Sequence, residues 1–323
     1  MRILITGGAG FIGSTFVNMM FRGELSDLED FQSVTVFDSL SIGGNLDNLI
    51  SVKNDPRFHF VQGDIRDFAL LNDALTGHDF VIHFAAQSHV DRSIKDPLEF
   101  FDVNAIGTSN VLQASLRQQV RKVIHISTDE VYGSIDSGSW DENSPLLPNS
   151  PYASSKACSD LIALSYFKTY GLDLNITRCC NNYGPNQFIE KAVPLFITNL
   201  LSNKKIPLYG DGQNSREWLY VEDHCRAIAK VLSQGTPGEI YNIGGGLELN
   251  NLELANRIIS NLNLDSDLIE FIDDRLAHDR RYSLNFDKVF SSLGFIPQVA
   301  FDDGLDRTIN WYRDNFEFWR TND

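Results

Sequence analysis

Tyr152 and Lys156 stand four residues apart, directly after Pro151, in a segment that we expect to begin a helix. Four residues make about one helical turn, so the two side chains lie on the same face of that helix. A nearby ammonium stabilises a phenolate, and we therefore expect Lys156 to lower the Tyr152 pKa from about 10 toward neutrality. Such a tyrosine could act as a base toward a hydroxyl group. The spacing alone is common on exposed helix faces, so its meaning depends on the neighbouring elements.

A second group of reactive side chains, Thr128, Asp129 and Glu130, directly follows the apolar run at 123–127. The run predicts a strand, and the active sites of open α/β sheets lie beyond the carboxyl ends of their strands. Two adjacent carboxylates cost free energy unless a proton is shared or used in catalysis. An exposed loop is the alternative for this pair taken alone. Beside Tyr152, the triplet predicts two further acid/base groups.

Gly7, Gly10 and Gly13 follow the first apolar run and open a helical segment. Glycines at this spacing let the backbone turn sharply and approach a pyrophosphate, which the helix N–H groups then face. Asp38 ends the next apolar run, where a carboxylate can accept hydrogen bonds from both ribose hydroxyls and would repel a 2′-phosphate. These features predict bound NAD, with a helix cap or turn as the alternative role of Asp38. The other expected cofactor contacts are Phe11, Ile12, Asp64, Ile65, Ala85 and Ala86.

The segments that carry these residues alternate regularly along the chain. Short apolar runs alternate with stretches of helical length, which predicts an α/β fold with a doubly wound parallel sheet of Rossmann type, covered by helices on both faces. The runs lie at 3–6, 33–37, 58–62, 80–84, 123–127 and 172–177, and residues 241–243 are expected to return to the sheet. Glycine and proline clusters interrupt this alternation of segments after residue 180. We therefore expect a Rossmann domain of residues 1–180 with about 217–250, and a smaller C-terminal substrate-binding lobe of 181–216 and 251–323.

Composition narrows the class of protein. The chain of 323 residues has a formal net charge of -16, which would repel nucleic acids and anionic membrane surfaces. No segment reaches the length of a transmembrane helix, and a first strand beginning at Arg2 is expected to leave no room for a signal peptide. The four cysteines match no zinc or disulfide framework, and the six histidines other than His278 show no metal-ligand spacing. We expect a cytoplasmic protein without a bound metal.

Four longer motifs carry a resemblance to a known family. They are AAQSHVDRS at 85–93, VNAIGT at 103–108, RCCNNYGP at 178–185 and REWLYVEDH at 216–224. From the first glycine turn to about residue 295, the chain resembles the extended short-chain dehydrogenase/reductases, and within them the dTDP-glucose 4,6-dehydratases. The resemblance implies an NAD-dependent lyase that eliminates water from dTDP-glucose to give dTDP-4-keto-6-deoxyglucose. That product leads to deoxysugars such as rhamnose.

The resemblance also implies a role for each reactive side chain. Tyr152 would take the proton from the glucose 4-hydroxyl while hydride leaves C4 for NAD, and Lys156 would bind the nicotinamide ribose. Glu130 would then remove the C5 proton, and Asp129 would protonate the departing 6-hydroxyl. Hydride would then return to C6, and Thr128 would hydrogen-bond the 4-oxygen. The scheme needs two acid/base groups besides the tyrosine, and the triplet contains both.

Further contacts follow from the same resemblance. Asn104 would lie at the cofactor. Arg216 and Arg275 suit a diphosphate because a guanidinium can bind two phosphate oxygens, and Tyr209 could stack on the nucleobase. For each arginine alone, a surface salt bridge is the commoner role. The expected contacts to the nucleotide-diphosphate sugar are Ser88, Asn181, Glu190, Lys191, Pro207, Tyr209, Arg216, Asn251, Arg275 and His278.

Two helical segments, 97–118 and 152–170, carry broad apolar faces. Packing inside the monomer explains part of this pattern, and the resemblance implies that the same segments form a four-helix interface in a homodimer.

Other functions remain open from the sequence. The first alternative is a UDP-glucose 4,6-dehydratase or a UDP-glucose 4-epimerase of the same superfamily, although epimerases need no such acid pair and resemble the chain less closely here. The second is a non-catalytic NAD-binding module on the same fold. Such modules often lack the tyrosine or the lysine, and this chain has both. Related dehydratases and decarboxylases keep the glutamate but typically carry serine before it. Asp129 is therefore the residue that best discriminates between these functions.

Overall fold

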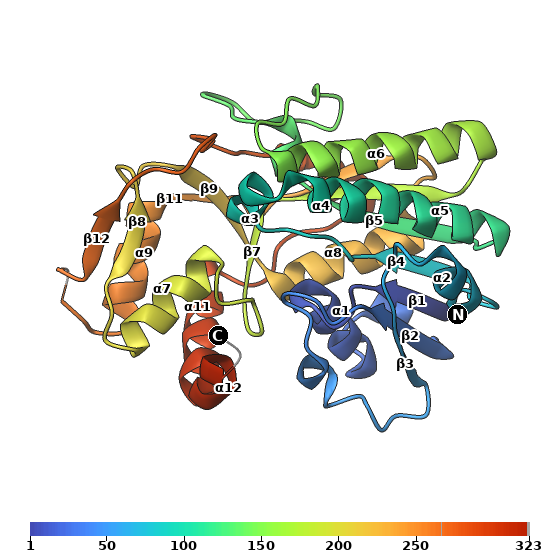
Figure 1. The fold of residues 1–323 in the computed structure, drawn as a ribbon, viewed down its shortest axis with the longest axis horizontal. Coiled ribbons are helices and arrows are strands. Elements are labelled where there is room, and N and C mark those ends of the chain that lie inside the picture. The colour runs from blue at the N-terminus through green and yellow to red at the C-terminus, as the bar shows by residue number, and fades with distance from the viewer. Residues whose placement is uncertain (266, 322–323) are drawn as a thin grey trace.

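The computed structural model describes residues 1–265 and 267–321, in two layered parts (Figure 1). The larger part is built on a seven-stranded parallel sheet with the strand order β10-β6-β5-β4-β1-β2-β3. Its strands are β1 (Arg2–Thr6), β2 (Ser33–Asp38), β3 (Phe58–Gln62), β4 (Phe80–His83), β5 (Lys122–Thr128), β6 (Leu174–Cys179) and β10 (Ile240–Ile243). The predicted doubly wound sheet is confirmed, and β10 pairs with β6, so residues 241–243 do return to it.

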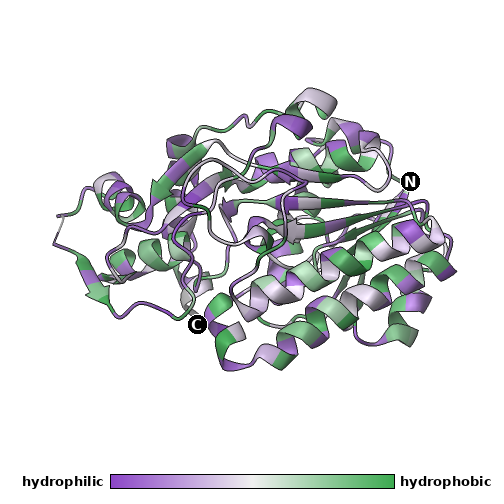
Figure 2. Cartoon of the chain, turned by 90° about the horizontal axis from the view of Figure 1, so that it is seen from above, coloured by the Kyte–Doolittle hydropathy of each residue, from purple (hydrophilic) through white to green (hydrophobic). Residues whose placement is uncertain are grey.

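Helices cover both faces of this sheet because neighbouring strand residues point to opposite sides. Ile3 and Ile5 pack with α1 and α8 in one core, whereas Leu4 packs with α2, α5 and α6 in another. Figure 2 shows apolar (green) and polar (purple) residues mixed along the helices that flank the sheet. They are α1 (Phe11–Phe21), α2 (Phe68–Ala74), α3 (Val90–Lys95), α4 (Pro97–Phe101), α5 (Thr108–Arg117), α6 (Pro151–Tyr170) and α8 (Val221–Gln234).

The segment 97–118, expected as one helix, is divided in the structure. A π-helical stretch, Asp102–Gly107, separates α4 from α5. Such stretches are rare and often lie at functional sites. This one turns Asn104 inward, where the side chain is buried.

The smaller part lies on the left of Figure 1. It holds a three-stranded sheet of order β11-β9-β7 and a two-stranded sheet of β12 and β8, which share one apolar core with the helices around them. Its strands are β7 (Asn181–Tyr183), β8 (Ile206–Tyr209), β9 (Ser215–Tyr220), β11 (Leu247–Asn250) and β12 (Ile269–Ile272). Its helices are α7 (Ala192–Leu201), α9 (Asn251–Asn261), α11 (Phe301–Asp314) and α12 (Phe316–Thr321).

The chain crosses between the two parts more than once. β9 and β11 belong to the smaller sheet, although most of their residues fall within 217–250, and α10 (Asp287–Leu293) packs against α8 and β10 of the larger part. The predicted division into lobes stays a prediction. No helix in the described part of the chain is long and apolar enough to cross a membrane.

Candidate active site

A cavity of about 340 Å³ runs along the carboxyl ends of the main sheet. It extends from the glycine turn after β1 to the segment between β7 and α7. The predicted site residues on its wall are Gly7, Gly10, Phe11, Ile12, Gly13, Asp38, Asp64, Ile65, Ala85, Ala86, Ser88, Thr128, Asp129, Glu130, Tyr152, Lys156, Asn181 and Lys191. The structure therefore brings the expected cofactor turn and the expected catalytic side chains into one space.

The glycine turn at one end of the cavity requires its glycines. Gly7 has φ of +70°, and a Cβ there would lie 2.5 Å from the Ala85 nitrogen. A Cβ on Gly13 would lie 2.4 Å from the Gly7 oxygen. Because the N-cap of α1 is Gly10, the helix has no side-chain cap of its own, and its first residues line the cavity. This cradle fits a dinucleotide pyrophosphate.

Asp38 lies at the end of β2 and is buried. Its Oδ2 accepts a hydrogen bond from the Ala9 nitrogen (2.9 Å), and its Oδ1 accepts one from the Leu40 nitrogen (2.8 Å). Burial raises its pKa, and the two N–H donors oppose that rise. Each carboxylate oxygen keeps a further lone pair, so the geometry suits two ribose hydroxyls.

The loop after Asp38 contains cavity residues that the sequence reasoning missed. Ser39, Ser41, Gly43 and Gly44 all lie on the wall, and a Cβ on Gly44 would approach Asp38 Oδ1 to 2.9 Å. The pair of adjacent glycines shortly after a predicted ribose ligand was the available signal.

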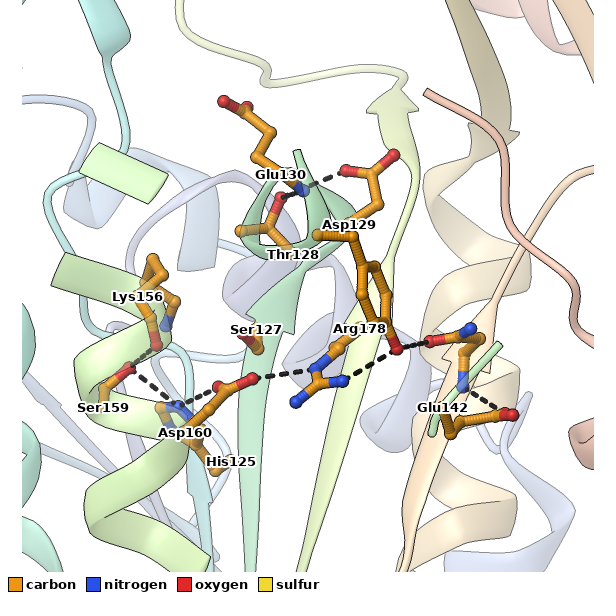
Figure 3. Close-up of polar contacts among 12 residues, drawn as sticks. His125, Ser127, Thr128, Asp129, Glu130, Glu142, Lys156, Ser159, Asp160 and Arg178 are labelled. Carbon is orange, nitrogen blue, oxygen red and sulfur yellow. Dashed lines mark hydrogen bonds and ion pairs between the residues drawn. The ribbon is translucent and has the colours of Figure 1, made fainter. Parts of the chain in front are cut away.

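The reactive triplet begins where β5 ends (Figure 3). Thr128 Oγ1 donates to Asp129 Oδ1 (3.2 Å) and accepts a hydrogen bond from the Glu130 nitrogen (3.3 Å), so the threonine caps the short turn that carries both acids. Burial, reinforced by the negative charge of Glu130, raises the Asp129 pKa well above its usual value. Burial also raises the Glu130 pKa, but Arg275 and Arg216 oppose it. The surroundings therefore favour the protonated form of Asp129 more strongly than that of Glu130.

The expected depression of the Tyr152 pKa is wrong for this structure. Burial raises that pKa well above 10, and the charge of Glu130 adds to the rise. Lys156 does line the same cavity, but its Nζ donates to the Ile126 oxygen (2.7 Å), and burial lowers its own pKa to about 8. The free-energy cost of burying a phenolate thus exceeds the stabilisation that a single nearby ammonium gives it.

A buried network lies beneath Lys156 (Figure 3). Asp160, one helical turn further along α6, accepts a hydrogen bond from Arg178 Nε (2.8 Å) and lies 3.3 Å from His125 Nε2. Arg178 also donates to the Tyr132 hydroxyl (2.8 Å). These contacts hold α6 against β5 and β6, the two strands that it covers. They therefore fix the position of Lys156 relative to the sheet.

Replacing Asp160 with asparagine is expected to lower the free energy of unfolding by about 3–5 kcal/mol, because Arg178 would stay buried without its carboxylate. Burial opposes ionisation of Asp160, but His125 and Arg178 outweigh it and lower the pKa from 3.8 to about 2. The stabilisation by this ion pair is therefore present above about pH 4 and is lost as the pH falls toward about 2. Urea unfolding at neutral pH measures the loss. The exposed helical variant Asp314→Asn is the control, and a loss for D160N below about 1 kcal/mol would contradict the expectation.

Asn104 lies behind the cavity wall. Its side chain accepts a hydrogen bond from the Gln87 nitrogen (2.8 Å) and donates to the Gln87 oxygen (2.9 Å) and to Ser155 Oγ (2.8 Å). It thereby holds the turn after β4 against α6. This places it as a support for the cavity wall, without a wall position of its own.

The structure brings only some of the residues expected at the sugar and diphosphate to this cavity. Lys191 Nζ donates to the Ser88 oxygen inside the cavity, whereas Glu190 forms an ion pair with Arg92 and lines a second cavity. His278 Nδ1 lies 2.6 Å from Asp274 Oδ1. Pro207, Tyr209, Arg216, Asn251, Arg275 and His278 lie outside the cavity wall, on the smaller part of the molecule.

Two of these outer residues still act on the catalytic acids. The positive charges of Arg275 and Arg216 oppose the rise of the Glu130 pKa, so both arginines lie close enough to influence this acid. Arg216 Nη2 donates to the Asp279 oxygen (3.0 Å), and its guanidinium lies 4.3 Å from the centre of the Tyr282 ring. Within residues 1–265 and 267–321, no group of three histidine, cysteine or acidic side chains is arranged to hold a metal ion.

Comparisons with known proteins place these features in a family. The family model described as GDP-mannose 4,6 dehydratase matches residues 4–308. The dTDP-glucose 4,6-dehydratase of an Actinoplanes species is 51% identical over 99% of this chain and 100% of its own length. DesIV, the dTDP-glucose 4,6-dehydratase of Streptomyces venezuelae, solved with NAD and TYD bound, is 55% identical, covers 99% of each chain and superposes with a TM-score of 0.98.

A more distant neighbour shares the fold with a different activity. The UDP-glucose 4-epimerase of Thermotoga maritima, solved with UDP-glucose, is 28% identical, covers 98% of this chain and 100% of its own, and has a TM-score of 0.89. Fold alone therefore does not separate the two activities, but identity over the full length does. The chain belongs to the family covered by the GDP-mannose 4,6-dehydratase model, and within it to the dTDP-glucose 4,6-dehydratases.

Proposed function

We propose that the protein eliminates water from dTDP-glucose to give dTDP-4-keto-6-deoxyglucose, with NAD as an internal hydride carrier. The observation that carries this proposal is the buried triplet of Thr128, Asp129 and Glu130, which shares one cavity with Tyr152, Lys156 and the glycine turn. Relatives of this name match the whole chain at about half identity, and the solved neighbours hold NAD. When bound, NAD would supply a reversible hydride carrier, which takes hydride from C4 of the sugar and gives it back at C6.

Each catalytic side chain has a separate role in this reaction. Tyr152 takes the proton of the 4-hydroxyl, and Lys156 holds the nicotinamide ribose and contributes positive charge. The 4-ketone acidifies the C5 proton, which Glu130 removes. Asp129 protonates the departing 6-hydroxyl, a role that its raised pKa supports because burial and the charge of Glu130 favour the protonated carboxyl group. Thr128 hydrogen-bonds the 4-oxygen.

The diphosphate and the base lie toward the smaller part of the molecule. Arg216 and Arg275 bind the diphosphate, since a guanidinium pairs well with phosphate oxygens and the charges of both already act on Glu130 at the cavity wall. Tyr209 stacks on the base; its ring lies edge-on to His278, with the ring centres 6.0 Å apart. Asn181 and Lys191 on the cavity wall contact the sugar. The remaining substrate contacts are Ser88, Glu190, Pro207 and Asn251.

An epimerase is the second candidate because of the shared fold. Asp129 favours the dehydratase, since epimerisation at C4 needs no group to protonate a 6-hydroxyl. The test is to supply dTDP-glucose and UDP-glucose separately and to analyse each product for its 6-hydroxyl and its C4 configuration. A 6-deoxy product formed faster from dTDP-glucose supports the proposal. An epimer that keeps its 6-hydroxyl would overturn it, and faster dehydration of UDP-glucose would correct the nucleotide.

The protein works as a homodimer through the outer faces of α4 to α6. Leu98, Ile106 and Leu161 are 78%, 55% and 58% exposed there, which is unusual for large apolar side chains so close together in a fold.

The free thiols of all four cysteines suit the reducing cytoplasm. The product feeds routes to deoxysugars such as rhamnose.

Replacing Leu161 with aspartate is expected to dissociate that dimer, because a charge in the interface weakens association by at least about 2 kcal/mol. Sedimentation velocity at several protein concentrations measures the shift to monomer. Ile50→Asp is the control, since Ile50 is similarly exposed (61%) but lies far from these helices in the sequence, directly after the short helix Leu46–Leu49. A dimer that survives L161D would show that another surface forms the contact.

A further inference from the structure

Arg216 carries a buried positive charge that no acid pairs with in the described part of the chain. The residue is 6% exposed, yet its side chain donates to backbone oxygens: Nη1 to the Ser215 oxygen (2.7 Å) and Nη2 to the Asp279 oxygen (3.0 Å). By contrast, the buried Arg178 forms an ion pair with Asp160. A buried charge without an acidic partner is costly, so this guanidinium is suited to an anionic ligand.

An acid that could neutralise Arg216 lies next to it. The residue whose backbone oxygen accepts the bond from Arg216 Nη2 is itself an aspartate, Asp279, and it is 6% exposed. Because the two residues are already in contact, a rotation of the aspartate side chain could bring its carboxylate to the guanidinium. Carboxylate and guanidinium form strong, often bidentate pairs. The structure nevertheless leaves this pair unformed.

Two other side chains occupy the oxygens of the Asp279 carboxylate. Asn149 Nδ2 donates to Oδ1 (2.5 Å), and the Tyr282 hydroxyl donates to Oδ2 (2.5 Å). Asn149 directly precedes Ser150, the N-cap of α6, so one of the two donors belongs to the larger part of the molecule. With a donor on each oxygen, the carboxylate is held by these two side chains and not by Arg216.

Tyr282 contacts both the arginine and the aspartate, each with a different part of its side chain. Its ring face lies 4.3 Å from the central carbon of the Arg216 guanidinium, and its hydroxyl binds Asp279. A ring face attracts a guanidinium without cancelling its charge. The Tyr282 nitrogen also donates to the Ser215 oxygen (3.3 Å), which fixes the ring beside β9. Burial lowers the Arg216 pKa, as expected for a charge that its surroundings compensate only in part.

We propose that Tyr282 and Asn149 keep the Asp279 carboxylate away from Arg216, so that the guanidinium stays unpaired for the diphosphate of the nucleotide sugar. This inference rests on the proposed function, which assigns the diphosphate to Arg216. Tyr282 is therefore a positioning residue that sets substrate affinity through Asp279 and Arg216. Without its hydroxyl, one carboxylate oxygen loses its donor and Asp279 can pair with Arg216. That internal ion pair then competes with the substrate.

The test measures the binding of dTDP to the NAD-bound enzyme by calorimetry, which requires no turnover. Tyr282→Phe removes the hydroxyl and keeps the ring, and we expect dTDP to bind about tenfold more weakly. Adding Asp279→Asn to this variant removes the competing charge and is expected to restore the affinity to within about twofold of wild type. Asp279→Asn alone should bind dTDP at least as tightly as wild type. With dTDP-glucose, Y282F should raise KM about tenfold and change kcat by less than about twofold.

The second substitution separates this role from a merely structural one. Y282F that binds dTDP as tightly as wild type overturns the inference. Weaker binding that Asp279→Asn does not restore also overturns it, because the loss then arises from the missing hydroxyl itself or from a disturbed fold. Tyr166→Phe, which removes a hydroxyl bonded to the Gln113 side chain, is the control and should bind dTDP normally.

Two further outcomes are distinguishable from these. If Y282F does not fold, as judged by bound NAD and circular dichroism, Asn149→Ala is compared with and without Asp279→Asn by the same criterion. Wild-type protein that binds dTDP but does not dehydrate dTDP-glucose contradicts the proposed function, while the dTDP affinities of the variants still decide the inference. Wild-type protein that does not bind dTDP overturns both.

Discussion

Replacing Tyr152 with phenylalanine is expected to reduce the turnover of dTDP-glucose by about 10³-fold or more, because it removes the base that starts the reaction. The ring itself is retained, and its edge-on packing against Phe100, with ring centres 6.4 Å apart, keeps the start of α6 in place. Bound NAD should therefore remain. Without the first proton transfer, C4 is not oxidised, so no absorbance of reduced nicotinamide should develop. Mass spectrometry of the nucleotide sugar and the near-ultraviolet spectrum measure both results.

Tyr166→Phe is the matched control for this prediction. Tyr166 lies on the same helix, and its hydroxyl contacts only the Gln113 side chain in the contacts described (3.1 Å). Its loss should leave turnover unchanged. If Y152F keeps more than about a tenth of wild-type turnover, Tyr152 is not the base and another group must take the 4-hydroxyl proton.

Replacing Asp129 with asparagine is expected to stop the reaction at a later point. Asparagine fills the same space but cannot give a proton to the 6-hydroxyl, so elimination should slow by about 10²–10⁴-fold. Oxidation at C4 does not use this side chain and should proceed. Reduced nicotinamide should then accumulate on the enzyme after dTDP-glucose is added, in contrast to Y152F. Stopped-flow absorbance and single-turnover product analysis distinguish the two variants.

Asp136→Asn is the control, because Asp136 is exposed on the connection that follows the same turn. It should behave as wild type. Normal dehydration by D129N would remove Asp129 from the mechanism. Slow dehydration with no reduced nicotinamide would assign it to the oxidation step instead.

Local patterns were sufficient to predict most of the larger part of the molecule. The β3 run at 58–62 matches the strand residue for residue, and the glycine turn leads from β1 into α1 as expected. These features depend on neighbours in the sequence: alternating apolar residues, a turn that only glycine permits and a helix start. The Tyr152 and Lys156 pair belongs to the same class, because helical spacing alone places both on one face.

Other features depend on contacts between distant segments, and the sequence could not predict them. The Tyr152 pKa follows from burial by several elements, so a rule based on the nearby Lys156 gave the wrong sign. The ion pair of Arg92 and Glu190 joins residues 98 positions apart. The role of Asn104 behind the cavity wall depends on a π-helical stretch that no local sequence pattern predicted. In each case the cause is tertiary packing.

The internal hydride shuttle is the central claim, and dTDP-glucose carrying deuterium at C4 tests it most directly. The purified protein with its NAD is incubated with this substrate, without added reductant, and the product is examined by mass spectrometry and NMR. We expect a nucleotide sugar that is lighter by one water, carries the deuterium at C6 and forms without net accumulation of reduced nicotinamide. Deuterium that stays at C4 in a product of unchanged mass would contradict the account, and so would a 6-deoxy product whose deuterium has been lost to solvent.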